Sequence, residues 1–140
     1  MNERLYISGL GLTATHYRRI SDGSQFNHLF PATTGTDPII SQGSSVFGTL
    51  DLMADIVYKT KSDTAKIAQV LKGKNLVETC RNIFDFAYKH IQYKQDKQGV
   101  EQLRRPARSW KDRKSGIDCD CFSIFCGSIL HNLGINHALR

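Results

Sequence analysis

Apolar positions in the second half of the chain recur at helical spacing, whereas the first fifty residues show little such periodicity. In the longest periodic stretch, apolar residues occur at i, i+4, i+7, i+8, i+11 and i+15, which is one face of an amphipathic helix. Asn75 precedes this stretch as a cap, with Glu78 in the capping-box position. The pattern predicts a helix of about four turns. Its buried face is expected to consist of Leu76, Cys80, Ile83, Phe84, Ala87 and Ile91.

A second helix is predicted near the end of the sequence. Gly116 breaks the preceding segment, Asp118 is a good N-cap, and Gly134 is the residue type expected just past a helix C-terminus. We expect the helix to begin at Cys119, and a strand to begin in residues 135–140. The face predicted to be buried consists of Cys119, Phe122, Ser123, Cys126, Leu130 and Leu133.

The rest of the chain shows weaker patterns. Residues 4–13 are compatible with a short strand, and a short helix through Ile67 is expected to stop at Gly73. Turn-forming residues dominate 21–48, which predicts loops or an extended arm. A charged segment separates the two long helices, and its residues 104–114 carry six basic side chains against one acidic side chain.

Composition changes near residue 50. Residues 1–50 hold six of the eleven glycines and have no net charge, so the whole formal charge of +6 lies in 51–140. We therefore predict an irregular Gly/Ser/Thr-rich arm over 1–50 and a compact core over 51–140. A chain of 140 residues has room for one hydrophobic core.

The chain shows neither a long apolar run nor an N-terminus that is first charged and then apolar. This pattern argues against a membrane span and a signal peptide. We therefore expect a cytoplasmic or virion-associated protein without membrane contact. In such a compartment, the four cysteines are expected to be thiols rather than disulfides.

Cys119 has the clearest candidate chemistry. A thiol attacks as its thiolate, which the free N–H groups and the positive dipole end of a helix N-terminus stabilise. On the first turn, Cys119 could act as a nucleophile and its backbone N–H as an oxyanion donor. Asp118 and Asp120 oppose this role, because nearby carboxylates raise the pKa of a thiol unless solvent screens them. Position alone therefore leaves open both a nucleophile and a plain buried cysteine.

The sequence around Cys119 resembles the core motif of the transglutaminase-like superfamily. In that motif a glycine and a cysteine are followed by acidic residues, an aromatic residue, an apolar helix, and then Gly-Ile with a basic residue on the next strand. Residues 115–123 (Ser-Gly-Ile-Asp-Cys-Asp-Cys-Phe-Ser) carry the similarity, together with Gly134 and Arg140. Asn136 stands where the family has proline, and Arg140 is displaced by two positions. The resemblance covers about residues 52–140 and is most specific around the cysteine.

The resemblance implies an α+β fold of the transglutaminase-like (papain-like) type, with the nucleophile at a helix N-terminus packed on a sheet. It implies that Cys119 attacks an amide carbonyl to form an acyl-enzyme. The expected activity is that of a peptidase or amidase on protein or peptide amides, because nothing in the sequence identifies an acceptor amine for cross-linking. No cofactor is implied.

Only the nucleophile carries over residue by residue. The family's histidine and aspartate lie on strands that would follow Arg140, so we expect the core to be truncated after the nucleophile helix and the next strand. The 140-residue chain alone is expected to be inactive.

The segment before the nucleophile borders the cleft in this family. Trp110 is therefore a candidate wall of the substrate groove, and Asp118 and Asp120 are candidates beside the thiol. The basic residues of 104–114 are expected in a solvated loop at this border. They could contact phosphates, but only Trp110 interleaves them, so nucleic-acid binding is not favoured.

The five histidines supply no obvious base. His131 lies about 18 Å along the helix from Cys119, at 1.5 Å per residue. His137, on the expected following strand, is placed better but is interpreted as an ordinary strand residue. His90 is expected as an exposed cation at a helix end. No role is assigned to His16 and His28.

A zinc site is a rival interpretation of the cysteines. Their steps along a helix do not line up on one face, and structural zinc sites usually use cysteine pairs from loops. We therefore expect no metal at Cys119, Cys121, Cys126 and His131, and we expect Cys80 and Cys126 to be small core residues.

A structural role is the alternative to the enzyme. An arm poor in core residues, attached to a compact half-domain, suits a protein that packs into an assembly such as a virion through that arm. The chain would then be a catalytically inactive transglutaminase-like assembly protein. Thiol reactivity distinguishes the two, because a catalytic Cys119 should be alkylated faster than Cys80 or Cys126.

Overall fold

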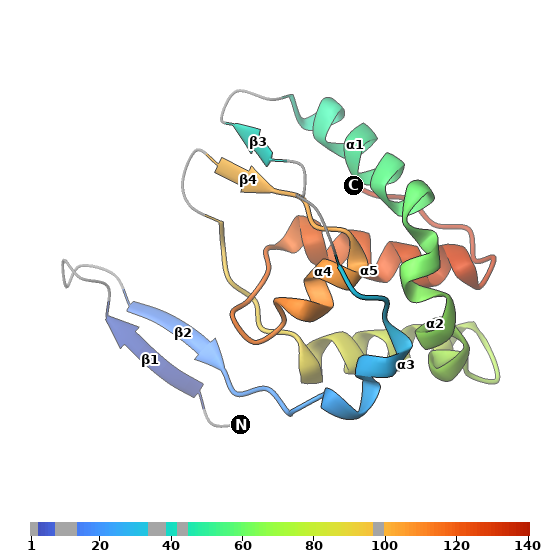
Figure 1. Ribbon diagram of the computed structural model, residues 1–140, viewed down its shortest axis with the longest axis horizontal. Helices are drawn as coiled ribbons and strands as arrows, with labels where there is room; N and C mark the ends of the chain where they lie inside the picture. Colours follow the sequence, from blue (N-terminus) through green and yellow to red (C-terminus); the bar gives the residue numbers. More distant parts are fainter. Residues whose placement is uncertain (1–2, 8–13, 34–38, 42–44, 97–99) are drawn as a thin grey trace.

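The computed structural model describes residues 3–7, 14–33, 39–41, 45–96 and 100–140. The protein is helix-rich with few strands, and helix α5 (Cys119–Asn132) runs through its middle (Figure 1). Four other α-helices and the second of two short 3-10 helices contact α5. In chain order, the helices before it are η1 (Ser24–Leu29), α1 (Val46–Lys59), η2 (Lys61–Thr64), α2 (Ala65–Leu71), α3 (Leu76–His90) and α4 (Pro106–Lys111).

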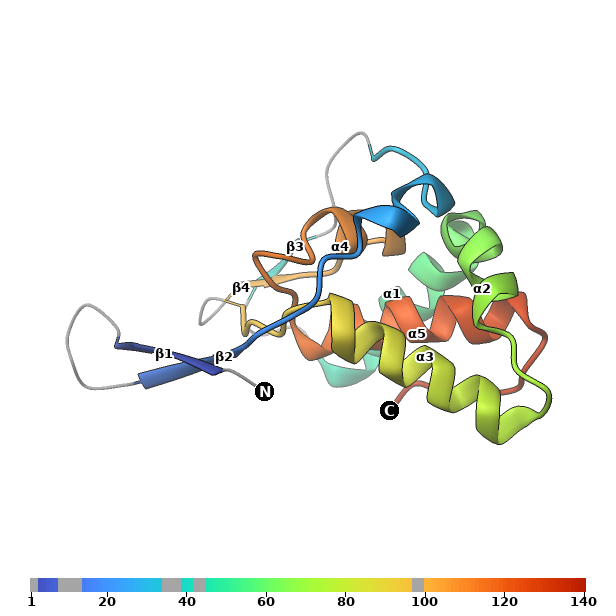
Figure 2. The same ribbon diagram turned by 90° about the horizontal axis from the view of Figure 1, so that it is seen from below.

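The described strands form two separate antiparallel pairs. Strand β1 (Glu3–Ile7) pairs with β2 (Ala14–Arg18), and β3 (Ile39–Ser41) pairs with β4 (Val100–Gln102). The β1–β2 hairpin projects from the helical body, as Figure 2 shows. The strand predicted within 4–13 is confirmed over β1, while residues 8–13 lie outside the described residues.

The helix predicted from Cys119 is confirmed, and its predicted buried face is partly right, because Phe122, Cys126, Leu130 and Leu133 pack half-buried against the core. The thiol-bearing residue Cys119 is exposed, whereas Cys121 and Phe125 are fully buried. Apolar residues occur on nearly all sides of α5, which several helices surround, so periodicity alone does not select the face turned to the core. The buried residues are Cys121, Ile124, Phe125, Gly127, Ser128 and Ile129.

The helix predicted after Asn75 is also confirmed, together with its cap. The Asn75 side chain accepts a hydrogen bond from the backbone N–H of Glu78 at 2.9 Å. The predicted face is partly wrong, because the exposed set includes Leu76, Cys80 and Phe84. Polar residues take part of the buried face since their polar atoms find partners in the fold. The buried residues of α3 are Thr79, Ile83, Phe86, Ala87 and His90.

Part of 21–48, predicted as loops or an extended arm, packs into the core. Phe30 stacks on Trp110 with ring centroids 4.6 Å apart, and Phe26 meets Phe86 edge-on at 5.1 Å. Helix α1 already begins within this stretch, with the Ser45 hydroxyl as its cap. The sequence periodicity does not reveal these contacts, because the aromatic partners lie 60 to 80 residues further along the chain.

The segment after α5 differs from the prediction as well. Residues 135–140 form no strand; they follow an irregular path against α1 and α5, with Leu139 in the smaller apolar cluster. Gly134 turns the chain out of α5 with φ of +67°, as expected for a residue past a helix end. The predicted strand at 135–140 is therefore wrong.

Buried polar contacts fix η2 against its neighbours. Arg105 makes two hydrogen bonds, at 2.8 and 2.7 Å, to the fully buried carboxylate of Asp63. The same carboxylate accepts the backbone N–H of Ala107 in α4. On the other side, the hydroxyls of Thr64 and Ser128 lie 2.7 Å apart. These contacts fix η2 between the start of α4 and the second half of α5.

Candidate functional site at the start of helix α5

The chain enters α5 through a tight turn at Gly116. Its φ is +110°, a conformation that favours glycine, and an added Cβ would lie 2.5 Å from the Cβ of Lys94. Beyond it, Ile117 bridges to Tyr93 in a parallel pairing. This turn places Asp118 and Cys119 at the surface end of α5.

Asp118 is the N-cap of α5, as predicted. Its Oδ1 accepts the backbone N–H of Cys119 at 2.6 Å, and its Oδ2 accepts the backbone N–H of Asp96 at 3.3 Å. The hydroxyl of Tyr93 also donates to Asp118, at 3.4 Å. The backbone N–H of Cys119, expected to be an oxyanion donor, is thus already engaged by the cap, which corrects that expectation for this conformation.

The Cys119 side chain is exposed on the first turn of α5, and its Sγ lies 3.8 Å from Oδ1 of Asp120. Partial desolvation, followed by the carboxylates of Asp118 and Asp120, raises the pKa of this thiol to about 12. The backbone N–H of Asp120 acts in the opposite direction, because it donates to the sulfur. The position suits a nucleophile, but the surrounding charge holds the sulfur in its thiol form.

A second carboxyl pair lies beside the thiol. Glu101, in β4, shares a hydrogen bond with Asp120, and this bond together with desolvation and the charge of Asp120 raises the pKa of Glu101 to about 7. Asp118 and Asp96 add to the negative field. Four carboxyl groups from three segments of the chain therefore surround the start of α5. Asp118 and Asp120 act on the Cys119 thiol, while Glu101 contacts Asp120 and Asp96 contacts Asp118.

Glu101 and Asp96 were not predicted as site residues. They lie 18 and 23 positions before Cys119, and they reach Asp120 and Asp118 because β4 and the segment after α3 pass the start of α5. Only the tertiary path of the chain brings them to the two aspartates that flank Cys119.

Cys121 has a different environment from Cys119. It is fully buried, its Sγ donates to the carbonyl of Gln102 at 3.2 Å, and it accepts from the backbone N–H of Arg104 at 3.4 Å. Desolvation raises the pKa of the Cys121 thiol, while Arg104 opposes that shift. This thiol is a structural contact between α5 and the segment after β4.

Trp110 is not a groove wall, which corrects the prediction. It is 3% exposed, and its indole N–H donates to the side chain of Asn27 at 2.9 Å. Its ring stacks against Phe30 and Phe86, and the Arg113 guanidinium lies 4.4 Å from its centroid. The Trp110 side chain therefore joins η1, α3 and α4 in the core.

The basic stretch 104–114 is not a solvated loop either. Its middle is α4, which begins at Pro106, a residue whose fixed φ suits the first helical position. Arg104 and Arg108 both donate to Asp112 at 2.9 Å. Arg105 is held by Asp63 and Arg113 is buried, whereas Lys111 and Lys114 are exposed.

None of the histidine side chains with a described position is hydrogen-bonded to Cys119. His90, expected to be exposed, is buried at the end of α3 with Nδ1 donating to the carbonyl of Ser21 at 3.1 Å. His131 lies near the far end of α5, and His137 follows it. His28 is exposed in η1, and His16 belongs to β2.

The rival zinc interpretation depends on how the cysteines are placed. Within the described ranges, no group of three or more His, Cys, Asp or Glu side chains is placed so that it could hold a metal ion. All four cysteines are free thiols, and Cys80, expected in the core, is exposed.

A polar cavity of about 260 Å³ adjoins the cap of α5. Asp96, which hydrogen-bonds Asp118, forms part of its lining, and Gly116 lies at its edge. The remaining lining residues are Lys94, Gln95, Gln102, Arg104 and Ser115. Cys119 is not among the lining residues, and Asp96 connects the cavity to the cap of α5.

Comparison of the chain with models of protein families, with curated proteins and with solved structures gave no match. Among the described residues, no helix combines the length and the apolar character that crossing a bilayer requires.

Proposed function

We propose that the protein is a transglutaminase-like cysteine hydrolase in which Cys119 is the nucleophile. The proposal is supported chiefly by one observation: Cys119 Sγ is exposed on the first turn of the helix that the resemblance identifies as the nucleophile helix. The packing of this helix end near the β3–β4 pair is compatible with the papain-like arrangement.

The reaction needs a base, and none of the histidines with a described side chain stands at the thiol. We propose that an imidazole comes from outside the described residues or from another chain. Asp118, Asp120 and Glu101 would favour that imidazole in its cationic form, since opposite charges attract at short range. A thiolate paired with an imidazolium is neutral overall, so the carboxylates that suppress a lone thiolate do not oppose the pair to the same extent.

The chemistry is acyl transfer to sulfur and then to water. The imidazole takes the proton of the Cys119 thiol, sulfur bonds to the carbonyl carbon, and the carbonyl electron pair moves to oxygen. The intermediate collapses, and the leaving amine takes the proton from the imidazolium. Water, deprotonated by the same imidazole, then attacks the thioester and releases a carboxylic acid and the thiol.

The cap has to move for the Cys119 N–H to stabilise the oxyanion. In the resting conformation Asp118 Oδ1 occupies this donor. We propose that substrate binding displaces the Asp118 carboxylate toward Tyr93 and the Asp96 N–H, both of which already hydrogen-bond it.

The test is hydrolysis of p-nitrophenyl esters by the protein expressed in its natural reading frame, with and without added imidazole. We expect the wild type to release p-nitrophenol faster than ester and imidazole without protein, and this excess to be lost in Cys119→Ala. The matched control is Cys80→Ala, since Cys80 is also an exposed thiol on a helix. Equal release by the wild type and Cys119→Ala, with imidazole present, would contradict the proposal.

The second candidate is an inactive transglutaminase-like assembly protein. The raised pKa of the Cys119 thiol favours it, because an exposed thiol that does not ionise cannot attack a carbonyl. Under this alternative, imidazole changes nothing at Cys119, and the ester experiment separates the two functions.

A further inference from the structure

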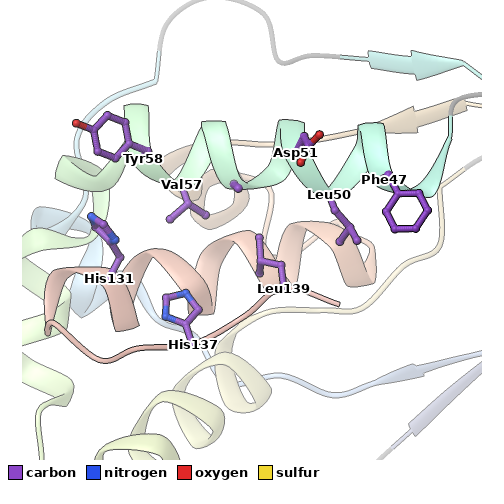
Figure 3. A pocket seen from close by; sticks show the side chains of 9 residues that line it. Phe47, Leu50, Asp51, Val57, Tyr58, His131, His137 and Leu139 are labelled. Carbon is purple, nitrogen blue, oxygen red and sulfur yellow. The ribbon is translucent and has the colours of Figure 1, made fainter.

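A second surface feature lies along the side of α5 that faces α1. It is a groove of about 570 Å³ between α1, the second half of α5 and residues 135–140 (Figure 3). His131, on its edge, lies about 18 Å along α5 from Cys119, at 1.5 Å per residue. The lining of the groove includes neither Cys119 nor any of the four carboxyl residues at the start of α5.

One side of helix α1 lines this groove along most of its length. The lining positions follow one helix stripe, at i, i+3, i+4, i+7, i+10 and i+11. Phe47 at one end and Tyr58 at the other are 80% and 63% exposed, so their rings stand in solvent. The lining residues on α1 are Phe47, Leu50, Asp51, Ala54, Val57 and Tyr58.

The floor of the groove is held by close packing. An added Cβ at Gly127 of α5 would lie 3.3 Å from His137 Nε2 and 3.6 Å from Leu139 Cδ2. Residues 135–140 thus lie against the backbone of α5. Leu139 packs in the same apolar cluster as Leu50. The groove is a formed feature with an apolar base.

The two ends of the groove differ in chemistry. In Figure 3, Phe47, Leu50 and Leu139 lie toward one end, and Tyr58 and His131 toward the other. The Lys61 ammonium lies 4.6 Å from the Tyr58 ring, and the His131 ring meets Tyr58 edge-on at 6.3 Å. The second end therefore offers a hydroxyl, an imidazole and an ammonium group, which are suitable partners for a carboxylate.

We propose that this groove binds an extended peptide segment of a partner protein, with apolar side chains toward Phe47 and an acidic side chain toward Tyr58 and Lys61. The distance along α1 from Phe47 to Tyr58 is about 16 Å, which corresponds to about five residues of extended peptide. A small ligand would leave these two exposed rings largely uncovered, whereas a peptide of this length covers both. The Asp51 carboxylate disfavours an acidic side chain in the apolar half of the groove. The acidic end of the peptide is therefore expected at the Tyr58 end.

The experiment uses fluorescence anisotropy with labelled octapeptides. One carries Leu-Phe-Leu followed by Glu-Glu, a second has lysine in place of both glutamates, and a third has serine in place of the apolar residues. We expect the first to bind about ten-fold more tightly than the other two, the difference typical of one satisfied charged contact or one buried side chain. Equal binding of the acidic and lysine peptides would overturn the proposal.

Two variant pairs locate the binding. Ala54→Trp fills the groove from an exposed position on α1, and Ala65→Trp adds the same ring at an exposed position on α2 outside the groove. We expect only the first to abolish binding of the acidic peptide. Lys61→Met should reduce the preference for the acidic peptide, while Lys66→Met, also exposed, should leave it unchanged.

Other occupants have their own outcomes. Dimers in sedimentation that Ala54→Trp abolishes, without peptide binding, would assign the groove to a second copy of the chain and overturn the proposal. If the fluorescent dye without peptide binds the groove and the unlabelled acidic peptide does not displace it, the proposal is also overturned. Because none of these measurements uses Cys119, their failure is distinguishable from a failure of the proposed hydrolase.

Discussion

Charged side chains have different partners on the two sides of the turn that leads into α5: opposite charges before it and like charges after it. Before the turn, each of Arg104, Arg105 and Arg108 donates to a carboxylate at 2.7 to 2.9 Å. After it, the carboxylates of Asp118 and Asp120 both act on the Cys119 thiol, and Asp120 shares a hydrogen bond with Glu101 of β4.

This contrast shows which charges serve the fold and which are candidates for chemistry. Paired and hydrogen-bonded charges can be buried without large cost, and here they join α4 to η2. Like charges gathered at one place raise the pKa values of their neighbours and give no obvious stability, and such perturbed groups cluster at functional sites. The basic stretch is therefore part of the scaffold, and the acidic helix start is the candidate site.

The largest effect is expected from Trp110→Ala on the scaffold side. The variant removes a buried ring stacked between Phe30 and Phe86, so the free energy of unfolding should fall by about 4 kcal/mol. Urea denaturation measures it, with Phe47→Ala, an exposed aromatic residue, as the control. A loss below about 1 kcal/mol, the level of ordinary surface changes, would contradict the assignment of Trp110 to the core.

Asp63→Ala tests the paired charges directly. It leaves Arg105 without its buried partner and the N–H of Ala107 without an acceptor, so a loss of about 3 kcal/mol is expected. Asp55→Ala is the matched control, because Asp55 pairs with Lys59 at the surface and should cost less than about 1 kcal/mol. Equal losses in the two variants would remove the distinction between scaffold and surface charges.

Asp118→Asn tests the like-charged side. Asparagine keeps the helix cap but removes one of the charges that, after desolvation, raise the pKa of the Cys119 thiol to about 12. The thiolate fraction at about pH 8, some one in ten thousand, should rise about ten-fold for each pKa unit recovered. Iodoacetamide labelling followed by peptide mapping measures this, with Cys80 as the internal reference. An unchanged ratio of the Cys119 and Cys80 rates would show that Asp118 does not control the thiol.

Glu101→Gln should have the smallest effect, visible as a change in the pH dependence of stability. The folded-state pKa of Glu101, about 7, lies above its ordinary value of 4.5, so between these pH values the folded protein binds more protons than the unfolded chain. Its contribution is therefore present below about pH 4.5 and is lost as the pH rises through 7. Between pH 4.5 and 7, the free energy of unfolding should fall by about 1 kcal/mol less in the variant than in the wild type. The difference is small because solvent screens the Glu101–Asp120 pair. Identical pH profiles of the two proteins in urea denaturation would contradict the shared proton.

Helix starts were predictable from sequence because their signals are local. Asn75 and Asp118 cap their helices through contacts within three residues. The phase of α5 was not predictable: apolar residues surround it, so Cys119 was placed on the buried face although it is exposed.

Long-range contacts account for the other differences. Trp110 is buried because Asn27 and Phe30, some 80 residues earlier, cover it. Glu101 reaches Asp120 through the path of β4. In each case the local pattern is compatible with an exposed residue, and only the tertiary contact decides. The site was predicted as far as Cys119 and its two adjacent aspartates, and no further.

The most direct test of the central claim is to look for an acyl group on the Cys119 sulfur. The protein is mixed with p-nitrophenyl acetate and imidazole, quenched in acid and digested, and each cysteine peptide is weighed by mass spectrometry. We expect acetyl on Cys119 in excess of that on Cys80, with the excess growing as imidazole is added. Acetylation of Cys80 equal to or greater than that of Cys119 at every imidazole concentration would contradict the account.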